Sequence, residues 1–174
     1  MFAIAAPTEV LHMQPIISTI SNSPTVLKRY RLLSTVLPEL AARVLERLQP
    51  EKVLSSLPPG WSAELARAAI ARKIPVIGVL KLPEYCSGKL QDPAGIDGEI
   101  LRNTQELIYA GRGHLTHEAY QEQCCYMIEH SDVLLVLHNG RPGTISSLVR
   151  YAEQENKQVI SLWSEFLNLT KEFN

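Results

Sequence analysis

The residues best placed to do chemistry lie near the C-terminus, in a glycine-containing turn between an apolar run and an amphipathic segment. The apolar run is 133–137, and the turn contains Gly140, Arg141, Gly143 and Thr144. An uninterrupted apolar run of this length predicts a strand buried on both faces. A helix that begins directly after such a strand presents free backbone N–H groups and the positive end of its dipole. The turn therefore predicts a site for a phosphate or carboxylate group, close to the charge of Arg141.

Two other loops are expected to lie beside this turn. They follow predicted strands at 15–20 and 53–57. Trp61 could stack on a base, and Ser62 could either contact a ligand or cap the helix predicted after it. These positions also have structural explanations, because glycine turns, serine caps and packed tryptophans are common without a ligand. The candidate ligand-binding residues of the three loops are Ser21, Asn22, Gly60, Trp61, Ser62, Gly140, Arg141, Gly143 and Thr144.

Hydrophobic spacing along the chain predicts strands that alternate with helices. The expected strands cover 15–20, 53–57, 75–80, 133–137 and 158–163. The expected helices cover 26–48, 62–73, 100–110, 116–129, the segment after Thr144 and a short C-terminal tail. Pro38 is expected to kink or divide the first of these helices, and a Pro- and Gly-rich stretch at 81–97 is expected to be a long loop or lid.

This alternation predicts an α/β protein with a Rossmann-like three-layer sandwich and a mostly parallel sheet. In such sheets ligands bind at the carboxyl ends of the strands, near the point where the strand order changes direction. The three candidate loops all follow predicted strands. We therefore expect them to meet at one edge of the sheet.

Composition favours a single soluble domain. The chain has 174 residues, a formal net charge of −1 and 45% hydrophobic residues. We place the domain at 15–174, after an N-terminal arm at 1–14. The absence of a basic excess argues against nucleic acid as a partner, and no apolar run approaches the roughly 20 residues of a membrane helix. An odd number of cysteines and no signal-peptide pattern predict a cytoplasmic protein with reduced thiols and no membrane contact.

Histidines and cysteines that gather between residues 114 and 130 could suggest a metal site. His114 and His117 are spaced like a ligand pair, but the Cys-x-x-Cys pair of common zinc sites is missing. Cys124 and Cys125 are adjacent, so on a helix they point to different sides. We predict buried cysteines and surface histidines, including His130, with no metal and no cofactor.

Two segments resemble a known family. Residues 53–66 are similar to the second strand and helix of the Rossmann-like SLOG superfamily. Residues 127–152 are similar to its closing block, with Ser-Asp before an apolar strand and Pro-Gly-Thr at the start of a helix. The superfamily includes the DNA-processing protein DprA, the LOG-type cytokinin-activating hydrolases and small YpsA-like proteins. The resemblance spans about residues 15–163 and implies a nucleotide-binding fold and a homodimer.

The resemblance does not extend to the catalytic residue of the LOG-type enzymes. Their GGxGTxxE pattern places a glutamate that takes part in catalysis where this chain has Ser147, which cannot act as a carboxylate base. Ser56 and Ser62 stand where a glycine and an aspartate are usual in the superfamily, whereas Gly60 keeps the second glycine. The resemblance therefore implies ligand binding without phosphoribohydrolase activity.

Three hypotheses about function follow. The first is a protein that binds a nucleotide or another phosphorylated small molecule, as a sensor or regulator. The second is an enzyme that cleaves or transfers an N-glycosidic bond, for which Glu84, Glu99 or Glu118 would have to supply the missing carboxylate. The third is a degenerate fold that contacts other proteins through its long amphipathic helix.

Overall fold

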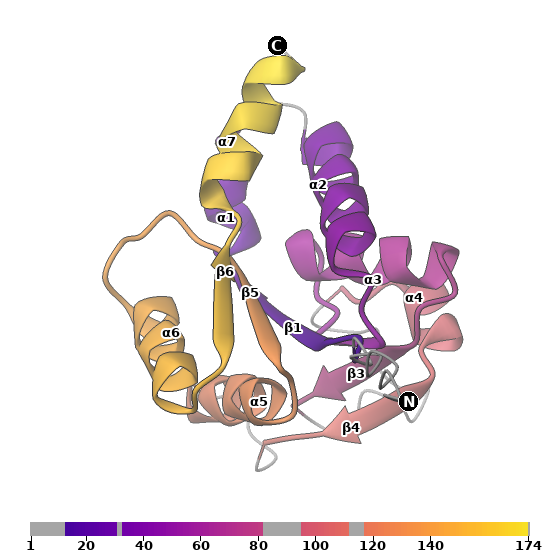
Figure 1. Cartoon of the computed structure of the whole chain (residues 1–174), viewed down its shortest axis with the longest axis vertical. Helices are drawn as coiled ribbons and strands as arrows, with labels where there is room; N and C mark the ends of the chain where they lie inside the picture. The colour runs from indigo at the N-terminus through magenta and orange to yellow at the C-terminus, as the bar shows by residue number, and fades with distance from the viewer. Residues whose placement is uncertain (1–12, 31–32, 82–94, 112–116, 174) are drawn as a thin grey trace, which may run out of the picture.

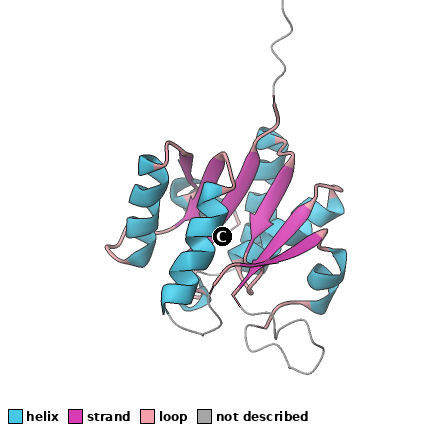
Figure 2. Cartoon of the chain, turned by 90° about the horizontal axis from the view of Figure 1, so that it is seen from below, coloured by secondary structure: helices cyan, strands magenta, loops and turns pink. Residues whose placement is uncertain are grey.

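The computed structural model describes residues 13–30, 33–81, 95–111 and 117–173. The chain folds into one six-stranded sheet in which every strand pair is parallel, with helices on both faces (Figures 1 and 2). The strands are β1 (Ile16–Ser21), β2 (Lys52–Ser55), β3 (Val76–Leu80), β4 (Glu106–Tyr109), β5 (Val133–Leu137) and β6 (Gln158–Ser161). The helices are α1 (Pro24–Leu27), α2 (Leu33–Leu48), α3 (Trp61–Ala71), α4 (Gly98–Asn103), α5 (His117–Glu129), α6 (Thr144–Gln154) and α7 (Trp163–Glu172).

The predicted α/β, Rossmann-like three-layer fold is confirmed. Most of the predicted N-terminal arm and most of the loop at 81–97 lie outside the described residues. No helix in the described ranges is long and apolar enough to cross a membrane.

The strand order places the switch point at β1. The order is β4-β3-β2-β1-β5-β6, so the sheet grows from β1 in one direction through β2 and in the other through β5. Ile17 pairs with both Val53 and Val133, and Ser21 at the end of β1 pairs with Leu137 at the end of β5. The loops that follow β1, β2 and β5 therefore leave the same edge of the sheet as neighbours, as expected at a switch point.

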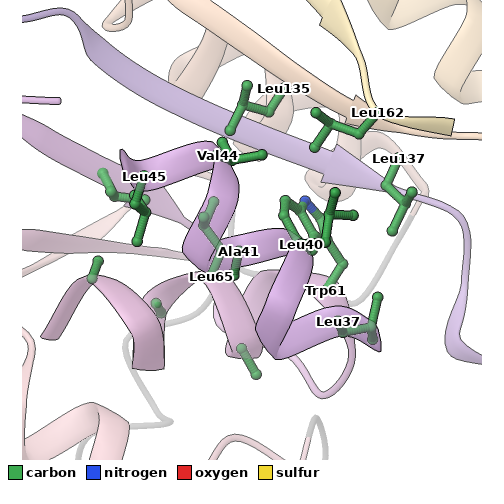
Figure 3. Close-up of a cluster of buried hydrophobic side chains, with 14 of the residues drawn as sticks. Leu37, Leu40, Ala41, Val44, Leu45, Trp61, Leu65, Leu135, Leu137 and Leu162 are labelled. Carbon is green, nitrogen blue, oxygen red and sulfur yellow. The ribbon is translucent and has the colours of Figure 1, made fainter. Parts of the chain in front are cut away.

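Two hydrophobic clusters hold the three layers together. The larger lies between one face of the sheet and helices α1, α2, α3, α4 and α7, and the smaller lies between the other face and helices α5 and α6. Figure 3 shows part of the larger cluster, where side chains from α2, α3 and β5 meet. Leu135 belongs to the larger cluster and Leu134 to the smaller. This two-sided burial explains the uninterrupted apolar run of β5.

The predicted helix at 26–48 is divided, but not at Pro38. Helix α1 ends at Leu27, and α2 begins at Leu33 and continues through Pro38. The missing N–H of Pro38 removes one intrahelical hydrogen bond, to the Ser34 carbonyl near the start of the helix. The helix persists because one side of it is buried in the larger cluster, through Val36, Leu37, Leu40, Ala41, Val44 and Leu45.

The prediction of a single helix at 100–110 is wrong. Helix α4 begins earlier, where the Asp97 side chain accepts a hydrogen bond from the Glu99 N–H at 2.8 Å, and it ends at Asn103. The following residues form β4 at the edge of the sheet, paired with β3. Residues 106–109 become a strand because β3 offers unpaired backbone N–H and C=O groups, and hydrogen bonds with β3 satisfy the backbone of β4. A local sequence pattern contains no information about this pairing.

Candidate ligand-binding site

A pocket of 440 Å³ opens at the carboxyl ends of β1, β2 and β5. Its volume falls within the range of small-molecule sites, about 300–1,000 Å³. Its walls come from the loops after these strands and from one side of α5. The lining residues are Thr19, Ile20, Ser21, Asn22, Ser23, Ser56, Pro58, Pro59, Ser62, Tyr120, Cys124, Met127, His138, Gly143, Thr144 and Ile145. The pocket therefore contains five of the nine predicted residues: Ser21, Asn22, Ser62, Gly143 and Thr144.

The start of α6 forms one wall of this pocket. Gly143 precedes the helix with φ 153° and ψ −163°, a conformation that favours glycine, and no side chain caps the helix. Gly143, Thr144 and Ile145 line the pocket. In the described part of the chain, no group accepts a hydrogen bond from the N–H groups of residues 144–146. An anion in the pocket would thus meet free donors and the positive end of the helix dipole.

Hydrogen bonds hold the loops after β1 and β5 in register. The Asn22 N–H donates to the Leu137 carbonyl at 2.9 Å, and the Asn139 N–H donates to the Asn22 side-chain oxygen at 2.9 Å. Asn22 is nearly buried, at 9% exposure. Its side chain is therefore committed to positioning the turn that leads into α6, and Asn22 shapes the pocket wall from the end of β1.

The second predicted glycine turn starts α3. Gly60 is the N-cap residue with φ 107°, so Ser62 does not cap the helix as its sequence position suggested. Ser62 is buried, and its carbonyl accepts a hydrogen bond from the Ser55 hydroxyl at 3.1 Å. Ser62 lines the main pocket, whereas Gly60 lines a separate depression together with residues such as Leu27 and Glu64.

Trp61 lies beneath the pocket rather than on its wall. Its side chain is 1% exposed in the larger hydrophobic cluster (Figure 3). Its indole Nε1 donates a hydrogen bond to the Thr19 hydroxyl at 2.5 Å. Thr19 in turn donates to the Leu135 carbonyl at 3.3 Å and lines the pocket. Trp61 therefore supports the pocket floor through Thr19 and has no ring face free for stacking in this structure.

Gly140 and Arg141 lie in the turn but outside the pocket lining. Gly140 has φ 77° and open space around it, and its N–H donates to Nδ1 of His138 at 3.2 Å. Arg141 is exposed, and its guanidinium makes no hydrogen bond or ion pair with a described residue. Its backbone carbonyl accepts a hydrogen bond from the Ser146 hydroxyl at 3.0 Å, which closes the turn onto α6.

The sequence prediction missed the wall formed by α5 and the residue that follows β5. Tyr120, Cys124 and Met127 line the pocket from one side of α5, and His138 lines it directly after β5. His138 could have been found from its place at the end of a buried strand. The α5 residues could not, since the side of the helix that faces the pocket depends on how α5 packs on the sheet.

The pocket offers neutral polar groups and helix dipoles rather than charged side chains. No Asp, Glu, Lys or Arg occurs among its lining residues within the described ranges. Of the carboxylates required by the enzyme hypothesis, Glu99 and Glu118 are exposed and do not line it, and Glu84 lies outside the described residues. Ser147, at the position of the LOG-type glutamate, is also exposed and outside the lining. Among the described residues, the pocket lining therefore supplies none of the carboxylates that the enzyme hypothesis requires.

Cys124 reaches the pocket as a protonated thiol. Burial raises the pKa of Cys124 to about 12, and it also raises the pKa of Tyr120, whose hydroxyl is hydrogen-bonded to the thiol. A thiolate, which is the form that attacks electrophiles and binds metals, is therefore scarce near neutral pH. Among the described residues, no three His, Cys, Asp or Glu side chains gather in a way that could hold a metal ion.

His138 is expected to make stability depend on pH. Burial lowers the pKa of His138 below its ordinary 6.5, so the unfolded chain binds more protons between the two pKa values. The free energy of unfolding should fall as the pH drops through this interval. Replacing His138 with Gln is expected to flatten this part of the profile, as measured by urea unfolding from pH 8 to pH 5. An equally steep profile in His138→Gln would show that His138 does not contribute.

Comparison with known proteins identifies the fold. No protein-family model and no curated protein matches the sequence. Among solved structures, the Moco carrier protein from Chlamydomonas reinhardtii is 17% identical, with a TM-score of 0.55 over 92% of this chain and 85% of that protein. The molybdenum cofactor binding protein from the phototrophic bacterium Rippkaea orientalis is 22% identical, with a TM-score of 0.50 over 91% and 85%.

DNA processing protein A from Helicobacter pylori, which binds single-stranded DNA, is 12% identical, with a TM-score of 0.57 over 88% of this chain and 67% of that protein. These neighbours are members of the SLOG superfamily, so the fold predicted from the sequence resemblance is confirmed. At identities of 12% to 22% the likeness shows the shared fold and does not transfer a ligand or an activity.

Proposed function

We propose that the protein binds a phosphorylated small molecule of the nucleotide class, with the phosphate at the start of α6. The observation that carries the proposal is the uncapped N-terminus of α6, which lines a pocket at the switch point of a parallel sheet. Gly143 allows close approach of the phosphate, and the backbone N–H groups of Thr144 and Ile145 donate to it. The hydroxyls of Ser21 and Thr144 add neutral donors.

The rest of the pocket suits the remainder of such a ligand. Ile20, Met127 and Ile145 provide apolar surface, and Pro58 and Pro59 add a conformationally restricted segment to the wall. Mostly apolar walls with a few fixed polar groups are typical of sites for small organic ligands. Two fold neighbours carry or bind the molybdenum cofactor, so related folds hold small ligands. The protein would then act by binding, as a sensor or regulator.

A thermal-shift comparison tests the proposal. The ligands are the four ribonucleoside monophosphates and ribose 5-phosphate, with adenosine as the matched compound without phosphate. At a concentration about 100 times Kd, a bound ligand adds about 2.7 kcal/mol of stability, which corresponds to a rise in Tm of about 5–10 °C for a domain of this size. We expect such a rise for at least one phosphorylated compound and none for adenosine.

The same assay separates the alternatives. If no phosphorylated compound shifts Tm at millimolar concentration, the ligand-binding proposal is wrong and the protein-interaction hypothesis gains support. If chromatography detects free base released from a bound nucleotide, the result would instead support the hypothesis of an enzyme that cleaves an N-glycosidic bond. A single-stranded DNA oligonucleotide is expected not to bind, because no Lys or Arg occurs among the described residues that line the main pocket. The homodimer remains a prediction, which sedimentation of the purified protein tests.

A further inference from the structure

A second cavity continues the main pocket toward β3. It has a volume of 110 Å³ and shares Ser56, Pro58 and Tyr120 with the main pocket. Its other lining residues are Leu80, Lys81, Ile96 and Gln123. The two cavities therefore lie side by side at the carboxyl ends of the strands, and we refer to them together as the groove. The start of α6 lies in the first cavity, and Gln123 and Lys81 lie in the second.

Gln123 presents a fixed hydrogen-bond acceptor to the second cavity. Gln123 is only 3% exposed, and its side-chain Nε2 donates a hydrogen bond to the Val79 carbonyl at 2.5 Å, which sets the orientation of the amide. The oxygen Oε1 makes no hydrogen bond with a described residue. Since no buried side-chain polar atom in the described part lacks a partner, Oε1 must face accessible space. Gln123 lines the second cavity, and we assign Oε1 to that space.

Lys81 places a donor in the same cavity. It follows β3 directly, and its Nζ lies 5.8 Å from the centroid of the Tyr120 ring. It forms no ion pair with a described carboxylate. The ring and Pro58, Leu80 and Ile96 add apolar surface around these two polar groups. A fixed acceptor and a cationic donor between apolar walls match the edge of a nitrogen heterocycle.

We propose that this second cavity is a base subsite, in which Gln123 Oε1 accepts a hydrogen bond from an N–H group of the ligand's heterocycle and Lys81 donates to an adjacent acceptor. The proposal rests on the function proposed above, because it requires the phosphate to lie at the start of α6. It narrows the ligand to a nucleotide whose base carries an N–H donor, and it makes Gln123 a specificity-determining residue.

The test measures binding by isothermal titration calorimetry with ribose 5-phosphate, the four ribonucleoside monophosphates and purine riboside 5′-monophosphate. The last compound has the shape of AMP but no N–H on its base. We expect at least one nucleotide to bind about tenfold more tightly than ribose 5-phosphate, since the base adds hydrogen bonds with Gln123 and Lys81 and apolar contacts that ribose 5-phosphate cannot make. If the preferred nucleotide is AMP, purine riboside 5′-monophosphate should bind about tenfold more weakly than AMP. The Gln123→Met variant should bind nucleotides no better than ribose 5-phosphate.

Gln121→Met is the matched control, because Gln121 lies on the same helix but lines neither cavity. It should retain the preference of the wild type. If Gln123→Met is too unstable to measure, Lys81→Met provides the second variant. Lys81→Met should weaken nucleotide binding about threefold to tenfold and leave ribose 5-phosphate unchanged.

Two results would overturn the base subsite while leaving the proposed function intact. One is ribose 5-phosphate binding as tightly as every nucleotide. The other is a Lys81→Met variant that loses the same factor of affinity for ribose 5-phosphate as for nucleotides, which would place the phosphate beside Lys81. If neither ribose 5-phosphate nor any nucleotide binds, the proposed function is wrong and the base subsite falls with it. This result differs from the two above, so failure of the subsite alone can be told apart from failure of both proposals.

Discussion

Replacing Gly143 with Asp is expected to weaken the binding of phosphorylated ligands by roughly 100-fold. The new carboxylate would lie at the start of α6, where the pocket offers N–H donors, the Thr144 hydroxyl and the positive end of a helix dipole. It would therefore occupy the anion site and repel a phosphate. Calorimetric titration with ribose 5-phosphate measures the effect directly, because this ligand has no base.

Two variants separate the sources of the loss. Gly143→Ala adds no charge but strains a backbone with φ 153°. Its loss of affinity therefore measures how much of the Gly143→Asp effect comes from backbone conformation alone. Asn156→Asp adds the same charge just beyond the opposite end of α6, where Asn156 is exposed, and should leave binding unchanged. Ribose 5-phosphate binding that survives Gly143→Asp would show that the phosphate site lies elsewhere.

Replacing Trp61 with Ala is expected to lower the free energy of unfolding by about 3–5 kcal/mol. The indole is 1% exposed within the larger cluster, so the substitution leaves a cavity and removes the hydrogen bond to Thr19. Tm should fall by about 10 °C. Urea unfolding followed by circular dichroism measures both quantities without depending on tryptophan fluorescence.

Trp163→Ala is the matched control, since Trp163 is only partly buried at the edge of the same cluster. Trp163→Ala should lower the free energy of unfolding by no more than about half as much as Trp61→Ala does. Trp61→Phe keeps most of the volume and removes the N–H donor, so it should cost about 1 kcal/mol through the bond to Thr19. Equal losses in Trp61→Ala and Trp163→Ala would contradict the role assigned to Trp61.

Several elements were predictable from local pattern because their burial is simple. Strand β5 is buried on both faces and appears in the sequence as five consecutive apolar residues. Helix α6 follows a Pro-Gly-Thr turn and repeats apolar residues at helical spacing. Strand β4 was missed because it is a partly exposed edge strand, and its conformation comes from pairing with β3. A local pattern carries little information about such a strand.

The candidate site was predicted in part for the same reason. Gly143 and Thr144 were found because a glycine turn between a buried strand and a helix has a local signature. Trp61 was assigned to the ligand because it follows a loop glycine, yet the packing of α3 turns its ring into the core. Gln123 was not considered, because nothing in its neighbours along the chain indicates that its amide meets the Val79 carbonyl 44 residues away.

The sequence by itself determined the alternation of strands and helices apart from β4, together with the buried central strand and the glycine turn that starts α6. These features depend on the spacing of apolar residues and on the backbone freedom of glycine, which are local properties. The tertiary structure alone decided which loops share a pocket and which residues of α5 face it. It also decided whether Trp61 and Gln123 serve the core or the groove. These outcomes depend on how distant segments pack against one sheet, and that packing is set by contacts between residues far apart in the chain.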